Sequence, residues 1–426
     1  MTNSSMFSIK KFLVMASLAL TVIITSITMP SGTSITSNAA SVKLKTKEVF
    51  VQKGKTTTIK LKNKSKKSVT WSVPSEYKNI VKITKKSKTQ ATIKGKATGA
   101  AIVKAKVGGK TYSCNVIVTL KEISGDTTGT LNVLDYGATA DDGTDDTSAI
   151  QSAIQDAASG ATIYIPAGTY NISINSETKA SLYLKGNTTL FMDPNAILKV
   201  SATSIDEYSV LYCYYQTNAV VKGGQIIGEL KNHKGSGDGE GHGIAIKDSS
   251  NVTISNVYVS KNWGDGIYIG SSSTSGPGCS KVTIDSCVIY DNGRSNISIV
   301  DANTVKINKC EIANAKGHAP QAGIDIEPNN LSRPIKNVTI SNTAIHTLGK
   351  GNSSGQYFCI QMYYNPGNLS TVSTNGLTIK NSKLYGDVGL YSAKNAKITN
   401  TTIKGTLYDV MKAKLKKVKY DGIWRP

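Results

Sequence analysis

Short stretches in which apolar and polar residues alternate recur through the second half of the chain. After residue 250 one such stretch occurs in six related copies. The copies are Val252-Thr-Ile-Ser-Asn-Val, Val282-Thr-Ile-Asp-Ser-Cys, Val305-Lys-Ile-Asn-Lys-Cys, Val338-Thr-Ile-Ser-Asn-Thr, Leu377-Thr-Ile-Lys-Asn-Ser and Ala396-Lys-Ile-Thr-Asn-Thr. Because each copy alternates and then meets Asn or another turn former, each is predicted to be a short β-strand that ends in a tight bend.

The spacing of the copies predicts how these strands connect. The first four copies are 30, 23 and 33 residues apart, which is too long for hairpins, and no helical pattern lies between them. Asn256, Asn342, Asn381 and Asn400 fall at the same phase, as expected where stacked coils share a left-handed corner and a ladder of side-chain amides. The pattern predicts an all-β protein built around a parallel β-helix, a solenoid whose coils bury a continuous core.

Alternation also marks residues 41–120, in segments such as 57–61, 69–73 and 101–105. Gly and Lys/Ser turns separate these segments, which predicts a small β-sandwich with Trp71 as a core aromatic residue. Residues 121–130 contain Ser, Gly, Asp and Thr, as is typical of a linker.

The first 40 residues have the pattern of a secretory signal peptide. Lys10 and Lys11 precede a mostly apolar stretch over residues 12–27, and small residues follow up to Ala39 and Ala40. An uncleaved membrane anchor is the alternative, but the apolar stretch is short for a membrane span. We therefore expect a protein that is secreted or held at the cell surface.

Positive charge is concentrated in the predicted sandwich. Residues 41–120 hold 20 Lys, no Arg and no Asp, and their only acids are Glu48 and Glu76, so the segment carries +18 of the chain's net +22. Such a surface attracts polyanions, for example an anionic cell-wall polymer. The lack of Arg argues against specific recognition of nucleic acid. The alternative is that the lysines only keep the module soluble.

The six cysteines show no spacing of the metal-site kind. Cys287 and Cys310 occupy the same phase of consecutive repeats, so both are expected to be buried thiols in the core. A disulfide remains open for a secreted protein, because nothing in the sequence fixes a pairing.

A helix is predicted where the solenoid begins. Asp146 and Thr147 can cap it, and its apolar face consists of Ala149, Ile150, Ala153, Ile154 and Ala157. Such a helix would cover the terminal coil, which otherwise exposes core and unpaired backbone groups.

The motifs around this helix are Val133-Leu-Asp-Tyr-Gly-Ala, Asp141-Asp-Gly-Thr-Asp-Asp-Thr-Ser-Ala-Ile and Ala161-Thr-Ile-Tyr-Ile-Pro-Ala-Gly-Thr-Tyr. They resemble the opening of the pectate-lyase-like superfamily of right-handed parallel β-helix proteins, which includes polygalacturonase-related enzymes and phage tailspike depolymerases. The likeness implies this fold for residues 131–426, with carbohydrate as the expected partner. Residues 41–120 resemble a bacterial immunoglobulin-like domain in Val69-Thr-Trp-Ser and Lys94-Gly-Lys-Ala-Thr-Gly. One fold hosts many activities, so the reaction has to be argued from the site.

A second repeated phrase indicates another sheet of the solenoid. Its copies are Gly243-Ile-Ala-Ile-Lys, Gly266-Ile-Tyr-Ile-Gly, Asn296-Ile-Ser-Ile-Val and Gly323-Ile-Asp-Ile-Glu. If the isoleucines point inward, the two-residue period of a strand places Tyr268, Ser298, Asp325 and Glu327 on one exposed face.

Two carboxylates on this face are candidates for catalysis. Asp325 and Glu327 are two residues apart on one strand, which places their carboxyl groups roughly 6 to 8 Å apart. That is near the separation at which an inverting glycosidase admits water between its acid and its base. Asp265 and Arg294 enter the same sheet from its leading edge and are expected to assist, Arg294 by holding an acidic sugar or by keeping one carboxylate ionised.

Further candidates for substrate binding lie around this pair. His318 and Gln321 belong to an insertion of the kind that builds a groove wall, and His242 follows a Gly-rich segment. Tyr268, Ser298, Gln361 and Tyr363 complete the set of expected substrate-binding residues.

The sequence supports three functional hypotheses. The first is a secreted glycoside hydrolase without a cofactor, although the Asp-Asp and Arg-Ile-Lys elements of polygalacturonases are missing, which argues against pectin hydrolysis. The second is a polysaccharide lyase or uronate epimerase, in which the acids would hold Ca²⁺. The third is a surface adhesin that binds glycans without cleaving them.

Overall fold

The computed structural model describes residues 42–62, 67–97, 99–119, 130–346, 358–365 and 367–425. The expected signal peptide and almost all of the expected linker lie outside the described residues. The boundaries of the four segments proposed from the sequence therefore stay predictions.

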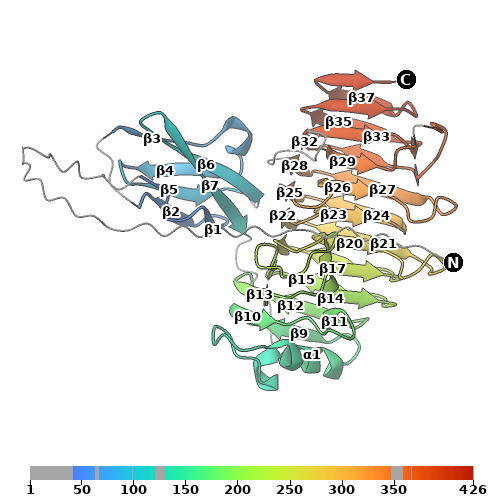
Figure 1. The fold of residues 1–426 in the computed structure, drawn as a ribbon, viewed down its shortest axis with the longest axis horizontal. Coiled ribbons are helices and arrows are strands. Elements are labelled where there is room, and N and C mark those ends of the chain that lie inside the picture. Colours follow the sequence, from blue (N-terminus) through green and yellow to red (C-terminus); the bar gives the residue numbers. More distant parts are fainter. Residues whose placement is uncertain are drawn as a thin grey trace, which may run out of the picture. The chain divides into compact units, whose positions relative to one another are not determined.

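Seven strands near the N-terminus form the two small sheets expected of a β-sandwich (Figure 1). One sheet has the order β1-β7-β6-β3 and the other the order β2-β5-β4. The strands are β1 (Glu48–Gln52), β2 (Thr56–Lys60), β3 (Val69–Ser72), β4 (Val81–Lys86), β5 (Gln90–Gly95), β6 (Gly99–Val107) and β7 (Lys110–Thr119). Trp71 is buried between them, and its indole Nε1 donates a hydrogen bond to the Ser87 carbonyl oxygen at 2.9 Å, so the predicted core aromatic residue is confirmed.

The strands after residue 160 wind into a right-handed parallel β-helix with three walls (Figure 1). Each strand pairs in parallel with the strand of the same wall in the next coil. The first wall, here called the repeat wall, contains β9 (Thr162–Ile165), β12 (Thr189–Met192), β15 (Val220–Lys222), β18 (Thr253–Ser255), β21 (Cys279–Asp285), β24 (Ala302–Asn308), β27 (Ile335–Ser341), β31 (Thr378–Lys380), β35 (Lys397–Ile403) and β37 (Lys414–Lys419). Three short strands extend its pairing, namely β8 (Leu131–Asn132), β30 (Thr374–Asn375) and β34 (Ala393–Lys394).

The other two walls complete each coil. The second wall contains β10 (Gly168–Ile172), β13 (Ala196–Val200), β16 (Gln225–Ile227), β19 (Tyr258–Ser260), β22 (Val288–Tyr290), β25 (Glu311–Ala313), β28 (Ala344–His346) and β32 (Lys383–Tyr385). The third, here called the ten-stranded wall, contains β11 (Ala180–Tyr183), β14 (Glu207–Tyr214), β17 (Glu240–Lys247), β20 (Ile267–Gly270), β23 (Ile297–Ile299), β26 (Ile324–Ile326), β29 (Phe358–Met362), β33 (Asp387–Leu390), β36 (Thr406–Asp409) and β38 (Gly422–Trp424). The fold class inferred from the two repeated phrases is confirmed.

The corner that follows each strand of the repeat wall has the predicted left-handed backbone. Asn256, Asn342, Asn381 and Asn400 have φ values of 60°, 52°, 52° and 47°. The Asn400 amide nitrogen donates to the Asn381 side-chain oxygen at 2.9 Å, as in the expected amide ladder. Asn tolerates this backbone region better than other residues with a Cβ atom, which explains its recurrence at the corner.

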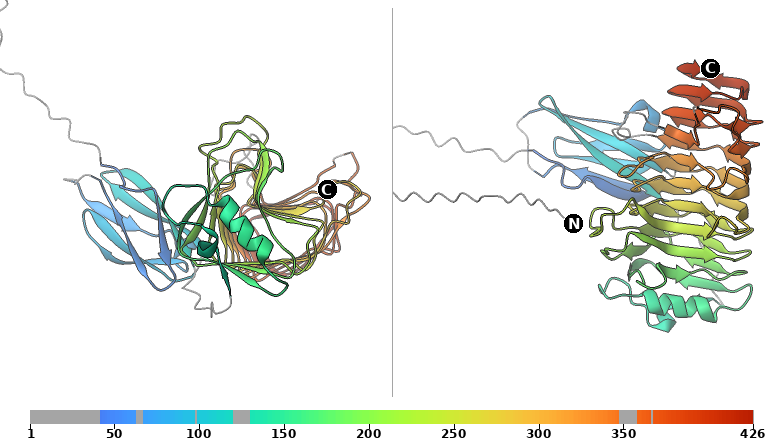
Figure 2. Two further views of the ribbon diagram at one scale, coloured as in Figure 1. Left: turned by 90° about the horizontal axis from the view of Figure 1, so that it is seen from below. Right: turned by 45° about the vertical axis from the view of Figure 1, so that its right-hand side comes forward.

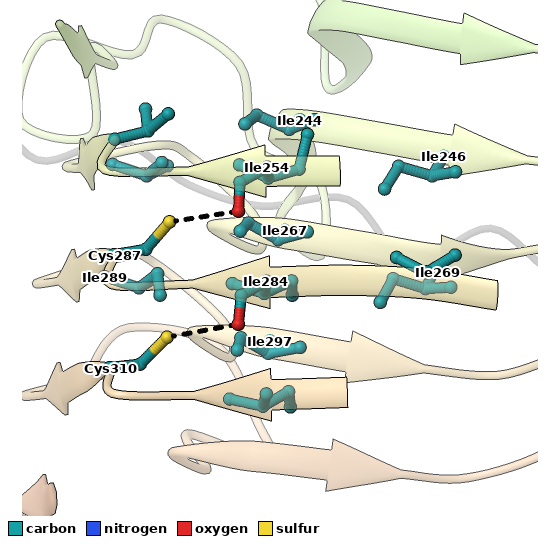
Figure 3. Packing of buried hydrophobic residues seen from close by; sticks show 14 of the residues in the cluster. Ile244, Ile246, Ile254, Ile267, Ile269, Ile284, Cys287, Ile289, Ile297 and Cys310 are labelled. Atoms are coloured by element: carbon teal, nitrogen blue, oxygen red, sulfur yellow. Dashed lines mark hydrogen bonds between the residues drawn. The ribbon is translucent and has the colours of Figure 1, made fainter. Parts of the chain in front are cut away.

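Isoleucines from the facing walls fill the interior of the solenoid. In Figure 3, Ile244, Ile267 and Ile297 point inward from three successive strands of the ten-stranded wall. Cys287 and Cys310 are buried in the same core as free thiols, and their Sγ atoms lie 3.6 Å from the carbonyl oxygens of Ile254 and Ile284. The expectation of buried, stacked thiols is confirmed. All six cysteines are free thiols in the structure.

Helix α1 (Thr147–Asp156) covers the first coil, as expected (Figure 2). Its residues Ile150, Ala153 and Ile154 belong to the solenoid core. The capping prediction for Asp146 was wrong in detail. Its carboxylate stands at the N-cap position but accepts hydrogen bonds from the backbone N–H groups of Thr139 and Asn171, so it fastens the turns beside the helix.

Two short 3₁₀ turns, Ser75–Tyr77 and Val133–Tyr136, are the other helical elements of the described residues. None of the described helices has the length and apolar character of a membrane span.

Candidate functional site

One row of outward-facing residues runs across consecutive strands of the ten-stranded wall. The strand register pairs Tyr183 with Tyr212, Tyr212 with Ala245, Ala245 with Tyr268, Tyr268 with Ser298, Ser298 with Asp325 and Asp325 with Gln361. The apolar residues on either side of these residues, most of them isoleucines, are buried in the solenoid core. Because successive strand residues point to opposite faces, the row lies on the outer side of the wall.

Ser298 and Asp325 are buried although they face away from the core. Their exposed fractions are 0% and 1%, so the prediction of an exposed face was wrong for these two positions. The reason is lateral crowding, since the side chains of neighbouring coils stand close together and cover one another. Glu327, which directly follows β26, is half-buried.

Burial gives Asp325 unusual electrostatics. Burial and, to a smaller extent, the nearby charge of Glu327 raise the pKa of the Asp325 carboxyl group to about 8, although Arg294 acts to lower it. Among the described residues the Oδ1 atom of Asp325 has no hydrogen-bond partner. Asp325 therefore keeps its proton at neutral pH and can donate it.

Arg294 and Asp265 form an ion pair beside this carboxyl group. The Nη1 atom of Arg294 lies 3.2 Å from Oδ2 of Asp265 and 3.5 Å from the hydroxyl oxygen of Ser298. Asp265 is fully buried, and its Oδ1 atom also accepts a hydrogen bond of 2.8 Å from the backbone N–H of Ser295. Burial alone would lower the pKa of Arg294, but the carboxyl groups of Asp265, Glu240 and Asp325 together raise it.

His242 connects this ion pair to the aromatic part of the row. Its Nδ1 atom lies 3.6 Å from Oδ2 of Asp265, and its Nε2 atom lies 3.4 Å from Oε2 of Glu240. Its ring stacks on Tyr268, with 4.7 Å between ring centroids and an interplanar angle of 19°. The hydrogen bond from His242 lowers the pKa of Glu240, whereas burial raises the pKa of Tyr268 to about 12.

A pocket of about 220 Å³ opens on the side of His242 that faces the first coils. Its lining residues are Thr178, Lys179, Glu207, Tyr208, Ser209, Tyr212, Glu240, His242 and Lys247. The Lys247 ammonium lies between two tyrosines, 6.0 Å from the ring centroid of Tyr212 and 5.3 Å from that of Tyr268. Within the described residues this ammonium pairs with no carboxylate, although Lys247 lines the pocket.

The structure brings most of the predicted site residues together and separates two of them. Asp265, Arg294, Ser298, Asp325, Tyr268 and His242 form one connected cluster, and Gln361 adjoins it through its register with Asp325. Tyr363 follows on the same wall, where its backbone N–H donates to the Ile326 carbonyl oxygen.

His318 and Gln321 lie in a separate cluster at the leading edge of the wall. The His318 ring packs edge-on against Trp263 at 4.4 Å, and the side chain of Gln321 donates to the carbonyl oxygen of Gly317. Trp263 also stacks on His233 at 3.8 Å. These contacts fasten the insertion, and its role as the wall of a substrate groove stays a prediction.

Sequence reasoning missed Lys247, Glu240 and His233. The His233 ring is buried between two acids, with 2.9 Å from Nδ1 to Glu229 and 2.9 Å from Nε2 to Asp206. No motif signals these residues, because part of their surroundings comes from other coils, such as Asp206 beside His233 and the rings of Tyr212 and Tyr268 beside Lys247. Among the described residues no group of three or more His, Cys, Asp or Glu side chains is arranged to hold a metal ion.

Two family models match separate parts of the chain. Residues 130–206 match the family "Rhamnogalacturonase A/epimerase, pectate lyase-like", and residues 228–403 match "Right handed beta helix region". The uncharacterised protein YclG of Bacillus subtilis is 34% identical over 251 residues, which are 53% of this chain and 42% of YclG. The chain spans less than half the length of the curated relatives it matches.

Solved structures with a similar fold have low sequence identity. One is the tailspike protein gp49 of the Acinetobacter baumannii bacteriophage Fri1, a capsular polysaccharide depolymerase, with 14% identity, coverage of 78% of this chain and 59% of that chain, and a TM-score of 0.48. Another is the A-module of the mannuronan C-5 epimerase AlgE6 of Azotobacter vinelandii, with 17% identity, coverage of 69% and 96%, and a TM-score of 0.46. At such identities the chemistry of a neighbour does not transfer to this chain.

Proposed function

Because the chain is a right-handed parallel β-helix protein of the pectate-lyase-like superfamily, we propose that it is a secreted enzyme that cleaves an extracellular polysaccharide by glycoside hydrolysis. One observation carries the proposal. Asp325 is a buried carboxyl group with a pKa raised to about 8, it faces outward from the core, and it has a second carboxylate, Glu327, beside it. A protonated acid next to a second carboxyl group is the arrangement that glycoside hydrolysis requires.

The residues around the pair have distinct roles in this proposal. Asp325 donates its proton to the leaving glycosidic oxygen, and Glu327 activates a water molecule as the general base. Arg294 and Asp265 act as positioning residues, because their ion pair holds the guanidinium beside Ser298 and Asp325. His242 and Tyr268 line the approach to the acid.

The test is incubation of the protein with a panel of neutral and acidic polysaccharides, with reducing ends and ultraviolet absorbance of unsaturated sugars read together. We expect new reducing ends without unsaturated products. Asp325→Asn and Glu327→Gln should each lower the rate by about 10² to 10⁴-fold without unfolding the protein. Full activity in both variants would rule this site out.

A second candidate is a lyase or uronate epimerase, and one contact favours it. Tyr268 stacks on His242 within reach of Lys247 and Arg294, so a base, a proton donor and cations for a uronate carboxylate lie together. Unsaturated sugar products would show that the protein is a lyase and not a hydrolase. Altered sugar stereochemistry without cleavage would show that it is an epimerase. If this reaction requires calcium, adding a chelator would abolish the activity.

We also propose that the lysine-rich sandwich attaches the protein to an anionic cell-wall polymer. Lys60, Lys82, Lys104 and Lys106 are exposed on its strands, as attraction to a polyanion requires. Teichoic-acid-containing cell walls should retain the protein at low salt and release it at high salt, because surface charges are screened. Retention that does not depend on salt would contradict this role.

A protein that binds glycans and leaves their chain length unchanged would be an adhesin.

A further inference from the structure

Charge is distributed unevenly along the solenoid. Residues 131–426 hold 27 Lys and Arg against 24 Asp and Glu, so the solenoid as a whole is close to neutral. Residues 131–178 hold seven of these acids and no Lys or Arg, whereas residues 374–420 hold ten Lys and two Asp. The near-neutral average therefore hides a strongly basic region in the last described coils, around β35 and β37 (Figure 1).

All ten lysines of this region are exposed, and its two acids lie on another wall. Asp387 belongs to β33 and Asp409 to β36 of the ten-stranded wall, and Asp409 is buried in an ion pair with Arg425. The ammonium of Lys404 lies 3.7 Å from the carboxylate of Asp421, and none of the other nine lysines forms an ion pair with a described carboxylate. Their charges are therefore available to an anion from outside the chain.

Strand register gathers six of these lysines into one surface, here called the terminal lysine cluster. Its members are Lys380, Lys383, Lys414, Lys416, Lys417 and Lys419. Lys380 and Lys416 both pair in register with Thr399, and Lys383 and Lys419 both pair with Thr402. Since strands of one wall are about 4.8 Å apart, each of these two lysine pairs spans roughly 10 Å along the solenoid.

The terminal lysine cluster extends around a corner of the solenoid. Lys416 lies on the repeat wall, and Lys417 stands at the left-handed corner with a φ of 54°. Lys419 follows the corner and lies in line with Lys383 of β32 on the second wall. A flat lipid surface can contact one wall at a time, whereas a flexible chain can follow the bend and contact both walls.

Protection of a sheet edge does not account for the whole cluster. Lysines on an exposed edge strand prevent pairing with other chains. This explains lysines in β37, which among the described strands pairs with β35 alone. It does not explain Lys380 in β31 or Lys383 in β32, because both of these strands have a paired neighbour on each side. The lysines of the inner strands therefore indicate an external partner.

We propose that the terminal lysine cluster is a binding site for a flexible anionic polymer, separate from the lysine-rich sandwich and from the candidate reaction site. The cluster contains no Arg and no aromatic residue, the side chains that read nucleic-acid bases or stack on them. Lys ammonium groups are hydrated point charges on flexible stems, so they suit a chain of repeated phosphate or carboxylate groups without a fixed geometry. This inference goes beyond the proposed hydrolysis and does not depend on it.

Earlier coils of the same solenoid provide a matched control. Lys281, Lys306 and Lys336 are exposed on β21, β24 and β27 of the repeat wall. The control variant Lys281→Gln/Lys306→Gln/Lys336→Gln loses three positive charges. The cluster variant Lys414→Gln/Lys416→Gln/Lys419→Gln loses the same number. A difference between the two variants therefore reports where the charge lies and not how much charge the protein carries.

The first test maps binding on the unaltered full chain by acetylation of its lysines, read by mass spectrometry. Linear polyphosphate and poly-L-glutamate are the probes, because neither is a carbohydrate that the candidate reaction site would take as a substrate. At a polymer concentration ten times the Kd, acetylation of the terminal lysine cluster should be about tenfold slower. Lys281, Lys306 and Lys336 should react at an unchanged rate. Equal acetylation of the cluster with and without both polymers would overturn the proposal.

The second test measures the Kd for fluorescent polyphosphate at low salt. Lys60, Lys82, Lys104 and Lys106 are changed to Gln in every protein compared, so that the sandwich contributes less to binding. The cluster variant should bind about three- to thirtyfold more weakly, because each exposed ion pair contributes modestly, and the control variant should stay within about twofold. Equal weakening by the two variants would show that net charge alone matters and would overturn the site.

Vesicles containing phosphatidylglycerol are the third probe. Slower acetylation of the cluster with vesicles and with neither polymer would replace the anionic polymer by a membrane surface and overturn the proposal. All three probes read binding and not cleavage. A wild type that releases no sugar product would therefore refute the proposed hydrolysis and leave the terminal lysine cluster unaffected.

Discussion

The repeat wall and the ten-stranded wall are built on the same buried core and present different chemistry outward. On the repeat wall the register aligns Thr253, Thr283, Lys306, Thr339, Thr378 and Lys397. On the ten-stranded wall the matching row reads Tyr212, Ala245, Tyr268, Ser298, Asp325 and Gln361. The row on the repeat wall contains only Thr and Lys, which suit any exposed strand. In the row on the ten-stranded wall the residue type changes at every coil.

The difference shows where stability and function are separated in this fold. Lys306 and Lys397 are exposed and keep their charges in water, which costs the folded state nothing. Asp325 is buried with an unpartnered oxygen among the described residues, an arrangement that destabilises a folded protein. Regular outward positions therefore mark the scaffold, and irregular, costly ones mark the candidate site.

The largest expected effect comes from breaking the ion pair of the ten-stranded wall. Arg294→Met leaves the carboxylate of Asp265 buried without its cation, so the free energy of unfolding should fall by about 3 to 5 kcal/mol. Urea unfolding measures this loss. Adding Asp265→Asn should restore part of the stability, because the uncompensated charge is then removed.

Arg333 is the control for this prediction. Its Nη2 atom lies 2.7 Å from Oδ2 of Asp301, in a more exposed ion pair. Arg333→Met should therefore cost less than Arg294→Met, since solvent screens the charge that remains. An equal cost for both variants would show that burial does not distinguish the Asp265 pair.

The fold could be predicted from the sequence because the repeats encode it directly. Ile254, Ile284 and Ile340 recur at the same position of the repeated strand, and the Asn corners recur at one phase, so pattern alone gives walls and coils. The alignment of Tyr268, Ser298 and Asp325 followed from the same reasoning, since register is fixed by the core.

The rest of the site could not be predicted because it depends on side-chain packing between coils. The sequence places Asp325 outward but does not show that its neighbours bury it. Lys247 has no motif, and its importance arises only where the rings of Tyr212 and Tyr268 approach it. His318 lies in the predicted insertion but contacts Trp263 instead of the acids.

A pair of core substitutions sharpens the comparison between the walls. Ile326 and Ile340 are both fully buried, one on the ten-stranded wall and one on the repeat wall. Ile326→Ala and Ile340→Ala should each lower the free energy of unfolding by about 2 to 5 kcal/mol, because both leave a cavity. Calorimetry measures the stability, and assays well below both unfolding temperatures measure the activity.

Only the first of these substitutions should change the activity of the folded protein. Ile326 adjoins Asp325 on β26, so a cavity there shifts the carboxyl group. Ile340 lies beneath the Thr and Lys row and should leave activity unchanged. Equal losses of activity would mean that the two walls do not differ in function.

The pH dependence of stability tests the burial of Asp325. Its pKa is about 8 in the folded chain and near 3.8 when unfolded, so the folded state holds a proton that the unfolded state releases. The free energy of unfolding should therefore fall as pH rises from about 4 to about 8, and change little outside this range through this group. Urea unfolding at a series of pH values measures the slope.

Asp325→Asn isolates the contribution of this carboxyl group from those of other titrating groups. The difference in stability between the variant and the wild type should grow in favour of the variant as pH rises toward 8. Lys306→Gln on the repeat wall should show no such trend. A constant difference for Asp325→Asn across this pH range would mean that the carboxyl group ionises normally.

The smallest expected effect concerns the corner of the repeat wall. Asn342 has a φ of 52°, and its amide nitrogen donates to the side-chain oxygen of Asn308 at 2.9 Å. Asn342→Ala should lower the free energy of unfolding by about 1 kcal/mol, because alanine is strained in this backbone region and cannot form the bond. Asn342→Gly relieves the strain and also lacks the bond, so it should be the more stable of the two. Equal stability of both variants would mean that the loss comes from the missing amide hydrogen bond and not from backbone strain. Unchanged activity in both would show that the corner contributes only to the stability of the scaffold.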